Sequence, residues 1–262
     1  MKRLFSNRQV NSGLLILLFL GVQFAVLPVG MIMAFTNPSV TEAELLQRIL
    51  PVQAASFLVG TILAIILGQA HQNKNRIELG RQTDPLLTVV WIIGGVFLAY
   101  ASQLVASMIN VNLLGNPIES ENTTQIIDMI RTAPFMILVV ALLGPILEEY
   151  VFRRAIFAEI YELFPGSSKG AKVMAFLVAG LVSGLIFALA HWDFTHILIY
   201  LAMSYTFSFL YVITGRLLVP ILVHMLMNGI VVGLNLLLGD YMEEIEELQE
   251  SLGIILKVIF PF

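Results

Sequence analysis

The sequence lacks cysteine and has few charged side chains. None of its 262 residues is Cys, and only 12% are Asp, Glu, Lys or Arg. The missing cysteine excludes disulfides, thiolate metal sites and a cysteine nucleophile. A soluble globular domain has about 25% charged residues, so this chain has too little polar surface to cover a water-soluble particle. Its net charge of −4 comes with no basic patch, so we expect no nucleic acid as a partner.

Long apolar runs dominate the chain instead. Apolar residues make up 58% of it, and a membrane-spanning helix needs roughly 20 of them in a row. The first run, from Leu14 to Phe35, is too long for a signal-peptide core and ends without a small-x-small cleavage site, so it predicts a retained span. Six more runs follow, at residues 49–70, 85–108, 133–157, 173–191, 196–214 and 217–239. We therefore expect an all-α, polytopic membrane helix bundle with about seven transmembrane helices, embedded in the lipid bilayer as a single domain over residues 1–262.

Two shorter segments lie outside these runs. Leu252–Phe262 is too short to span a membrane and has Lys257 in its middle, so it is expected at the membrane interface, or as half of an eighth span. Thr41 and Glu44 have the spacing of a capping box. That spacing predicts a short external helix over residues 37–48, before the second span.

The basic residues are distributed unevenly between the joints that connect the runs. Eleven of the fourteen lie on one side of the predicted membrane: Lys2, Arg3, Arg8, Lys74, Arg76, Arg81, Arg153, Arg154, Lys169, Lys172 and Arg216. The positive-inside rule places that side, with the N-terminus, in the cytoplasm of a multi-pass cell-membrane protein. With an odd number of spans, the acidic stretch Asp240–Glu250 is then expected outside.

Ionisable side chains next to apolar runs form three groups, and the first contains two carboxylates. A charged side chain costs about 2.5–3.5 kcal/mol at mid-membrane on insertion scales, so it needs an explanation. Glu148 and Glu149 follow a long apolar run, and Arg153 comes four residues after Glu149. Glu149 and Arg153 share a helix face and can pair, whereas Glu148 points about 100° away. Pro145, one turn earlier, is expected to loosen the backbone and open a water-accessible notch. The alternative is that the membrane ends here and that these charges lie at its surface.

Histidines mark the other two groups. His191 ends the fifth run, four residues after Phe187 and with His196 soon after. A histidine at a helix end is more often an interfacial or packed residue than a catalytic one. His224 and Asn228 lie four residues apart inside the seventh run, and therefore on one helix face. A polar contact between packed membrane helices would also explain this pair.

Taken together, these side chains can activate water. A glutamate or a histidine can take a proton from water, and an arginine or an amide can stabilise an oxyanion. Alternatively, Glu148, Glu149, His191 and His224 supply the ligand types of a divalent metal such as zinc, whose bound water is then the nucleophile. The His-Glu-x-x-His spacing is absent, so the residues leave open whether a metal takes part.

The order of the three motifs resembles the CAAX-protease and bacteriocin-processing (Abi) family of intramembrane proteases. Glu-Glu-x-x-x-Arg, Phe-x-x-x-His and His-x-x-x-Asn occur in that order on successive predicted helices, across residues 144–229. The motif-bearing core then covers about 133–239. The Gly-x-Ser-Gly string of rhomboid-type enzymes and the Gly-x-Gly-Asp string of presenilin-type enzymes are absent.

The resemblance implies an intramembrane endopeptidase that hydrolyses peptide bonds of a membrane protein or a membrane-associated peptide. It implies that Glu148 and His191 activate water. It also implies that Arg153 and Asn228 support the tetrahedral intermediate.

Glu149 and His224 receive structural or ligand roles from the same resemblance, which leaves metal dependence open. Two functions of other classes remain as alternatives. One is a non-catalytic membrane scaffold or bacteriocin-immunity factor that keeps the protease fold, although the motifs are intact. The other is a transporter whose Glu and His residues relay protons, although the chain shows no paired, interrupted half-helices.

The expected depths of the two histidines in the membrane conflict. Counted from Lys172, His191 lies about 28 Å along its helix, whereas His224, counted from Arg216, lies about 12 Å along its own. Both cannot meet Glu148 unless the helices tilt strongly or the fifth helix begins below the membrane surface. We expect the motifs to hold and the helix boundaries to shift.

Overall fold

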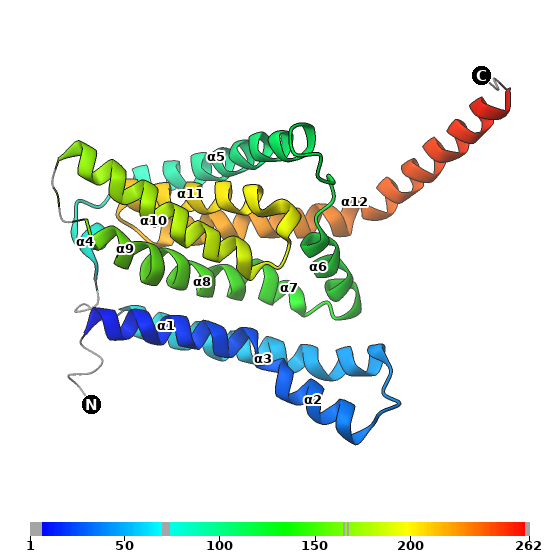
Figure 1. The fold of residues 1–262 in the computed structure, drawn as a ribbon, viewed down its shortest axis with the longest axis horizontal. Helices are drawn as coiled ribbons and strands as arrows, with labels where there is room; N and C mark the ends of the chain where they lie inside the picture. The colour runs from blue at the N-terminus through cyan, green and yellow to red at the C-terminus, as the bar shows by residue number, and fades with distance from the viewer. Residues whose placement is uncertain (1–6, 70–73, 165, 167, 260–262) are drawn as a thin grey trace.

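The chain folds into helices that mostly run side by side (Figure 1). The structure is a computed structural model that describes residues 7–69, 74–164, 166 and 168–259, with side chains through residue 238. Within these ranges the regular structure is helical and contains no strand. The long helices are α1 (Arg8–Gln23), α2 (Val26–Thr36), α3 (Glu42–Gln69), α5 (Pro85–Asn112), α10 (Lys169–Ala190), α11 (Ile197–Thr214) and α12 (Leu218–Ile259). The predicted all-α membrane bundle is confirmed.

Six helical stretches of the described chain are long and apolar enough to cross a membrane. They are Arg8–Thr36, Glu42–Gln69, Pro85–Asn112, Lys169–Ala190, Phe194–Thr214 and Leu218–Leu238. The first combines α1 with α2, and the fifth combines α11 with the 3-10 turn η4 (Phe194–His196). Large apolar side chains on these stretches remain exposed on the protein, among them Phe35 and Phe97. Such a surface suits contact with lipid.

The fourth predicted span is a run of short helical segments instead of one regular helix. The segments are α7 (Met136–Leu138), η2 (Val139–Leu143), α8 (Gly144–Glu148), η3 (Glu149–Phe157) and α9 (Ala158–Glu162), of which η2 and η3 are π-helical. Pro145 lies in the first turn of α8, where its missing N–H cannot complete the preceding turn. Two carbonyls of the loosened turn find side-chain donors: Thr61 Oγ1 donates to Leu143 O and Asn228 Nδ2 donates to Val140 O, each at 3.0 Å. The loosening expected from Pro145 is confirmed.

The segment before the second span belongs to that span. Thr41 and Glu44 do form a capping box, because Thr41 N donates to Glu44 Oε2 at 3.0 Å and Glu44 N donates to Thr41 Oγ1 at 3.3 Å. The helix that they cap is α3 itself, which continues through Pro51 to Gln69. The prediction of a separate external helix over residues 37–48 is therefore wrong, since helical winding does not stop where the polarity of the side chains changes.

Sequence patterns also miss one helix and misjudge the end of another. α6 (Glu121–Thr132) begins after Ser120, whose Oγ accepts the N–H of Thr123 at 3.2 Å. The sequence feature that could have predicted α6 was a capping residue followed by apolar side chains at helical spacing.

The backbone of α12 continues to Ile259, so residues 252–259 prolong that helix. Residues 260–262 and the side chains from 239 onward lie outside the described part, and the interfacial position of residues 252–262 stays a prediction.

The irregular fourth run lies between two groups of helices (Figure 1). α1, α2 and α3 pack together on one side, and α5, α10, α11 and α12 pack together on the other. The segment η3 contacts α1 and α10, and α8 contacts α3 and α12. The run that contains Glu148 and Glu149 is therefore surrounded by the rest of the bundle.

Charged side chains gather at the end of the bundle where α1 begins. Arg8 Nε lies 2.9 Å from Glu159 Oε1, and Arg154 Nε lies 3.0 Å from Glu78 Oε1. Basic residues from different joints thus share one end of the bundle, as the positive-inside pattern predicts. Arg153, which was predicted with them, lies inside the bundle instead, with 0% exposure. Two others of the predicted set lie outside the described residues, namely Lys2 and Arg3.

Candidate active site

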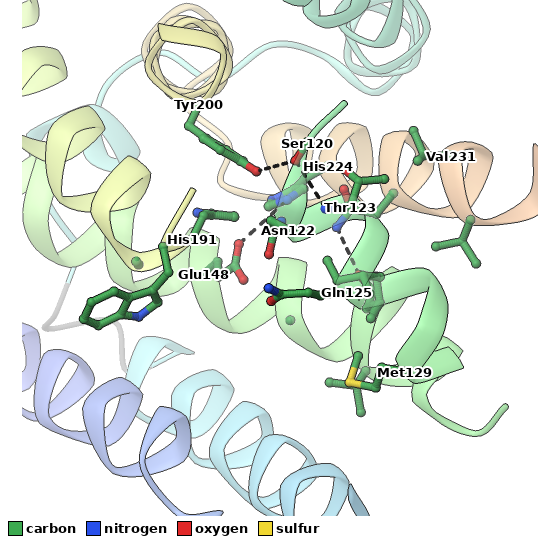
Figure 2. Close-up of a pocket in the computed structure, with 18 of the residues that line it drawn as sticks. Ser120, Asn122, Thr123, Gln125, Met129, Glu148, His191, Tyr200, His224 and Val231 are labelled. Atoms are coloured by element: carbon green, nitrogen blue, oxygen red, sulfur yellow. Dashed lines mark hydrogen bonds and ion pairs between the residues drawn. The ribbon is translucent and has the colours of Figure 1, made fainter. Parts of the chain in front are cut away.

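Side chains from three separate elements meet at one cavity. Glu148 ends α8, His191 follows α10 and His224 lies on α12, and all three line a cavity of about 530 Å³. Figure 2 shows the three side chains pointing toward one another. Glu148 Oε2 lies 3.8 Å from His224 Nε2. Asn228, one turn further along α12, also lines the cavity. The three motifs therefore bring their polar groups to one place.

The conflict between the depths of the two histidines is resolved by where α10 begins. This helix starts at Lys169, and its first turns extend beyond the start of α12 at that end of the bundle (Figure 1). The extra length lets His191, at the far end of α10, line the same cavity as His224 near the start of α12. As expected, the motifs hold and the helix boundary shifts.

The second carboxylate of the first motif faces protein instead of the cavity. Glu149 and Arg153 are both 0% exposed, and Arg153 Nε lies 3.1 Å from Glu149 Oε2. The other carboxylate oxygen, Oε1, accepts a hydrogen bond from His224 Nδ1 at 3.0 Å. Neither Glu149 nor Arg153 is among the residues that line the cavity. The two neighbouring glutamates thus have different surroundings, as helix geometry predicts, and this burial differs from the alternative of charges at the membrane surface.

The buried guanidinium of Arg153 lies between two aromatic rings. Its Cζ is 4.8 Å from the ring centre of Phe187 and 5.2 Å from that of Phe207. Phe187 also contacts His191, with 4.5 Å between ring centres, and Phe207 stacks on His224 at 4.8 Å. Cation–π contacts of this kind offset part of the hydration that a buried cation loses. The two aromatic rings therefore connect the arginine of the first motif to both histidines.

Hydrogen bonds fix one nitrogen of each imidazole. His191 Nδ1 lies 2.7 Å from Phe187 O, a carbonyl oxygen that can only accept. His224 Nδ1 meets the carboxylate of Glu149, which also accepts. Nδ1 therefore carries the hydrogen in both rings, and in the neutral form Nε2 is left as the proton acceptor.

The same side chains match a divalent metal in ligand type but not in arrangement. A histidine that ligates a metal usually donates its other N–H to a carbonyl or a carboxylate, as His191 and His224 both do. Within the described ranges, however, no three His, Asp or Glu side chains stand close enough together to hold a metal ion. Glu149, one of the four predicted ligands, is already paired with Arg153 and His224. The residues present therefore do not form a metal site, and no chemical step is assigned to a metal.

The turn between α10 and α11 contributes polar residues that sequence reasoning left without a role. Asp193 and His196 are buried there, each at 2% exposure. The ring of Tyr200 stacks on His191 with 4.4 Å between ring centres. Polar residues at the end of an apolar run resemble side chains at the membrane interface, so sequence reasoning assigned them no role. The one sequence feature that pointed to this turn was His196, five residues after His191.

Comparison with known proteins agrees with the motifs. Residues 130–230 match the family model described as "Type II CAAX prenyl endopeptidase Rce1-like". The chain is 37% identical over 204 residues to "Membrane-embedded CAAX protease MroQ" of Staphylococcus aureus (strain USA300), which covers 78% of this chain and 81% of that protein. It is also 37% identical over 201 residues to "Putative membrane peptidase YdiL" of Bacillus subtilis (strain 168), with 77% and 76% covered. No solved structure matches the chain.

The region matched by the family model includes all three motifs. Both relatives match more than three quarters of this chain, and both are named as a membrane protease or peptidase. The resemblance inferred from the motifs is confirmed, and so is an integral membrane protein with protease relatives. The chain belongs to the CAAX protease family of membrane-embedded peptidases.

Proposed function

We propose that this protein is an intramembrane endopeptidase whose nucleophile is a water molecule activated by Glu148 and His191. The observation that supports this most is that both side chains line one cavity together with His224 and Asn228. The substrate is a membrane protein or a membrane-associated peptide, because much of the remaining cavity wall is apolar and suits an apolar chain. The apolar wall includes Phe19, Phe57, Met129, Met136 and Ile199.

The proposed reaction is the addition of water to a peptide carbonyl. Glu148 takes a proton from the water while the water oxygen bonds to the carbonyl carbon, and His191 orients that water through Nε2. The carbonyl oxygen gains the negative charge. The proton on Glu148 then passes to the amide nitrogen as the carbon–nitrogen bond breaks, which releases an amine and a carboxylic acid.

Asn228 is the side chain placed to stabilise the developing oxyanion. One of its two amide N–H groups donates to Val140 O, and the other remains for a substrate oxygen at the cavity wall. Arg153 does not line the cavity, so its expected support of the intermediate is proposed to act through Glu149, which orients His224.

Cleavage is expected to continue in the presence of a metal chelator. The physical reason is that Glu148, His191 and His224, although they line one cavity, are not close enough together in the described structure to hold a metal ion. The measurement is hydrolysis of quenched hydrophobic peptides by the purified protein in detergent, with and without 1,10-phenanthroline, alongside the metal content of the sample. Loss of cleavage with chelator, restored by added zinc, would contradict this expectation and select the metal-assisted route.

The end of the bundle that contains Arg8 is proposed to face the cytoplasm of a cell membrane. Because the chain has no cysteine, single introduced cysteines report each side cleanly. Glu119→Cys lies exposed between α5 and α6, and Gly170→Cys lies exposed at the start of α10, where a Cβ meets no other atom within 4 Å. A membrane-impermeant maleimide should label Glu119→Cys on intact cells and Gly170→Cys only after permeabilisation. The reverse pattern would invert the assignment.

A further inference from the structure

The turn after His191 is strained and anchored. Trp192 has φ 56°, and it is the one non-glycine residue of the described chain with a positive φ. Side chains held in this region are uncommon and cluster at functional sites. The next residue, Asp193, ties the turn to neighbouring elements, so the strained conformation is fixed by the surrounding structure.

Four donors converge on the carboxylate of Asp193. Its Oδ1 accepts from His196 Nδ1 at 2.9 Å and from Thr195 Oγ1 at 3.0 Å. Its Oδ2 accepts from Ser120 Oγ at 2.7 Å and from the Tyr200 hydroxyl at 3.5 Å. Ser120 is the capping residue of α6, so this carboxylate connects α6, the strained turn and α11.

His196 is left with one nitrogen that no described residue satisfies. Because the carboxylate of Asp193 can only accept, Nδ1 carries the hydrogen, and in the neutral ring Nε2 is an acceptor. His196 is 2% exposed, its Nε2 has no hydrogen-bond partner, and the residue lines the same cavity as Glu148 and His191. A buried acceptor without a partner calls for an explanation.

We propose that His196, held by Asp193, is a substrate-positioning residue whose Nε2 accepts a hydrogen bond from one backbone N–H of the bound peptide. The inference rests on the proposed peptidase function. Tyr200 supports it, because its ring stacks on His191 and its hydroxyl reaches Ser120 (Figure 2). The same hydroxyl also reaches Asp193. The subsite and the water-activating histidine therefore belong to one rigid wall.

A peptide backbone N–H is the ligand that this geometry favours. An extended peptide presents donors and acceptors along its length that need partners once they leave water. A fixed acceptor in a mostly apolar wall satisfies one such donor and so sets the position of the chain relative to Glu148. A side chain that only positions substrate in this way changes binding in the ground state and in the transition state alike.

Two substitutions separate this role from a structural one. His196→Asn keeps a donor near the Nδ1 position for Asp193 but removes the Nε2 acceptor, so KM is expected to rise about fivefold, with kcat nearly unchanged. His196→Gln places an amide oxygen near the Nε2 position and should restore much of the affinity.

The matched control is Ser208→Ala, because Ser208 Oγ is also buried without a partner but does not line the cavity. The control is expected to keep the wild-type KM.

The deciding experiment uses a quenched hydrophobic peptide that the wild-type protein cleaves in detergent, together with its series of single N-methylated forms. One N-methyl position should weaken cleavage by the wild type yet cost nothing further in His196→Asn, while the other positions cost the same in both proteins. Equal losses at every position in both proteins would overturn the inference and leave the peptidase function standing. If the wild type cleaves no peptide of a broad hydrophobic library, the proposed function fails, and this inference fails with it.

Discussion

Glu148→Gln is expected to lower kcat/KM for peptide cleavage by about 10²–10⁴-fold, the range that a general base contributes. The amide keeps the size of the side chain but cannot take a proton from water. Glu148 is the one carboxylate among the described residues that line the cavity, so its loss leaves no other carboxylate at that wall. The measurement is cleavage of quenched peptides by purified protein in detergent. His191→Ala should cause a loss of the same order.

The control for Glu148→Gln is Glu119→Gln, which removes an exposed carboxylate outside the cavity and should leave kcat/KM unchanged. Undiminished cleavage by both Glu148→Gln and His191→Ala would remove the water-activating assignment. A cellular phenotype that depends on the protein and survives Glu148→Gln would instead favour the scaffold or bacteriocin-immunity function.

Glu149→Ala is expected to destabilise the protein by about 3–5 kcal/mol, because it leaves the guanidinium of Arg153 buried without its carboxylate. Both side chains are 0% exposed, so water cannot replace the lost partner. The aromatic contacts of Arg153 with Phe187 and Phe207 remain but do not neutralise the charge. The free energy of unfolding, measured by denaturant titration in detergent, gives the size of the effect.

The double variant Glu149→Gln with Arg153→Met separates stability from catalysis. It removes both charges and keeps an amide oxygen for His224 Nδ1, so most of the stability should return. Activity should stay about 10-fold to 100-fold below the wild type, because a neutral amide orients the imidazole less firmly than a carboxylate. Full recovery of both stability and activity would show that the ion pair does nothing for the reaction beyond folding.

Much of the fold and of the site could be predicted from the pattern of hydrophobic and polar residues along the chain. Apolar runs locate the spans, and ionisable residues next to such runs are costly enough to mark a site. Glu148, His191, His224 and Asn228 were found in this way, and the structure gathers them at one cavity. The separate fates of Glu148 and Glu149 follow from the angle between neighbouring helical residues alone.

Other features depend on contacts that no local pattern contains. The continuity of α3 from Glu42 to Gln69 was missed because its first turns are polar, so the capping box at its start was interpreted as the beginning of a separate short helix. Asp193 connects the turn to α6 through a hydrogen bond from Ser120 Oγ, and Ser120 lies 73 positions away in the chain. The helix that Ser120 caps, α6, has only 12 residues, of which a third are apolar, so its role beside the cavity is visible only once the bundle has formed.

The π-helical winding of η2 has a consequence for how this chain can change. In a π-helical turn the backbone hydrogen bonds join residues five apart instead of four, so the turn holds one residue more than an α-helical turn. The residues that follow it are rotated about the helix axis by roughly 100°. The surplus residue therefore decides which of the adjacent acids, Glu148 or Glu149, is wetted and which is enclosed. A deletion of one residue here would place Glu149 where Glu148 now lies, and an insertion would place Glu148 in the enclosed position of Glu149. We therefore expect the number of residues between Val139 and Leu143 to matter more than which apolar side chains fill those positions.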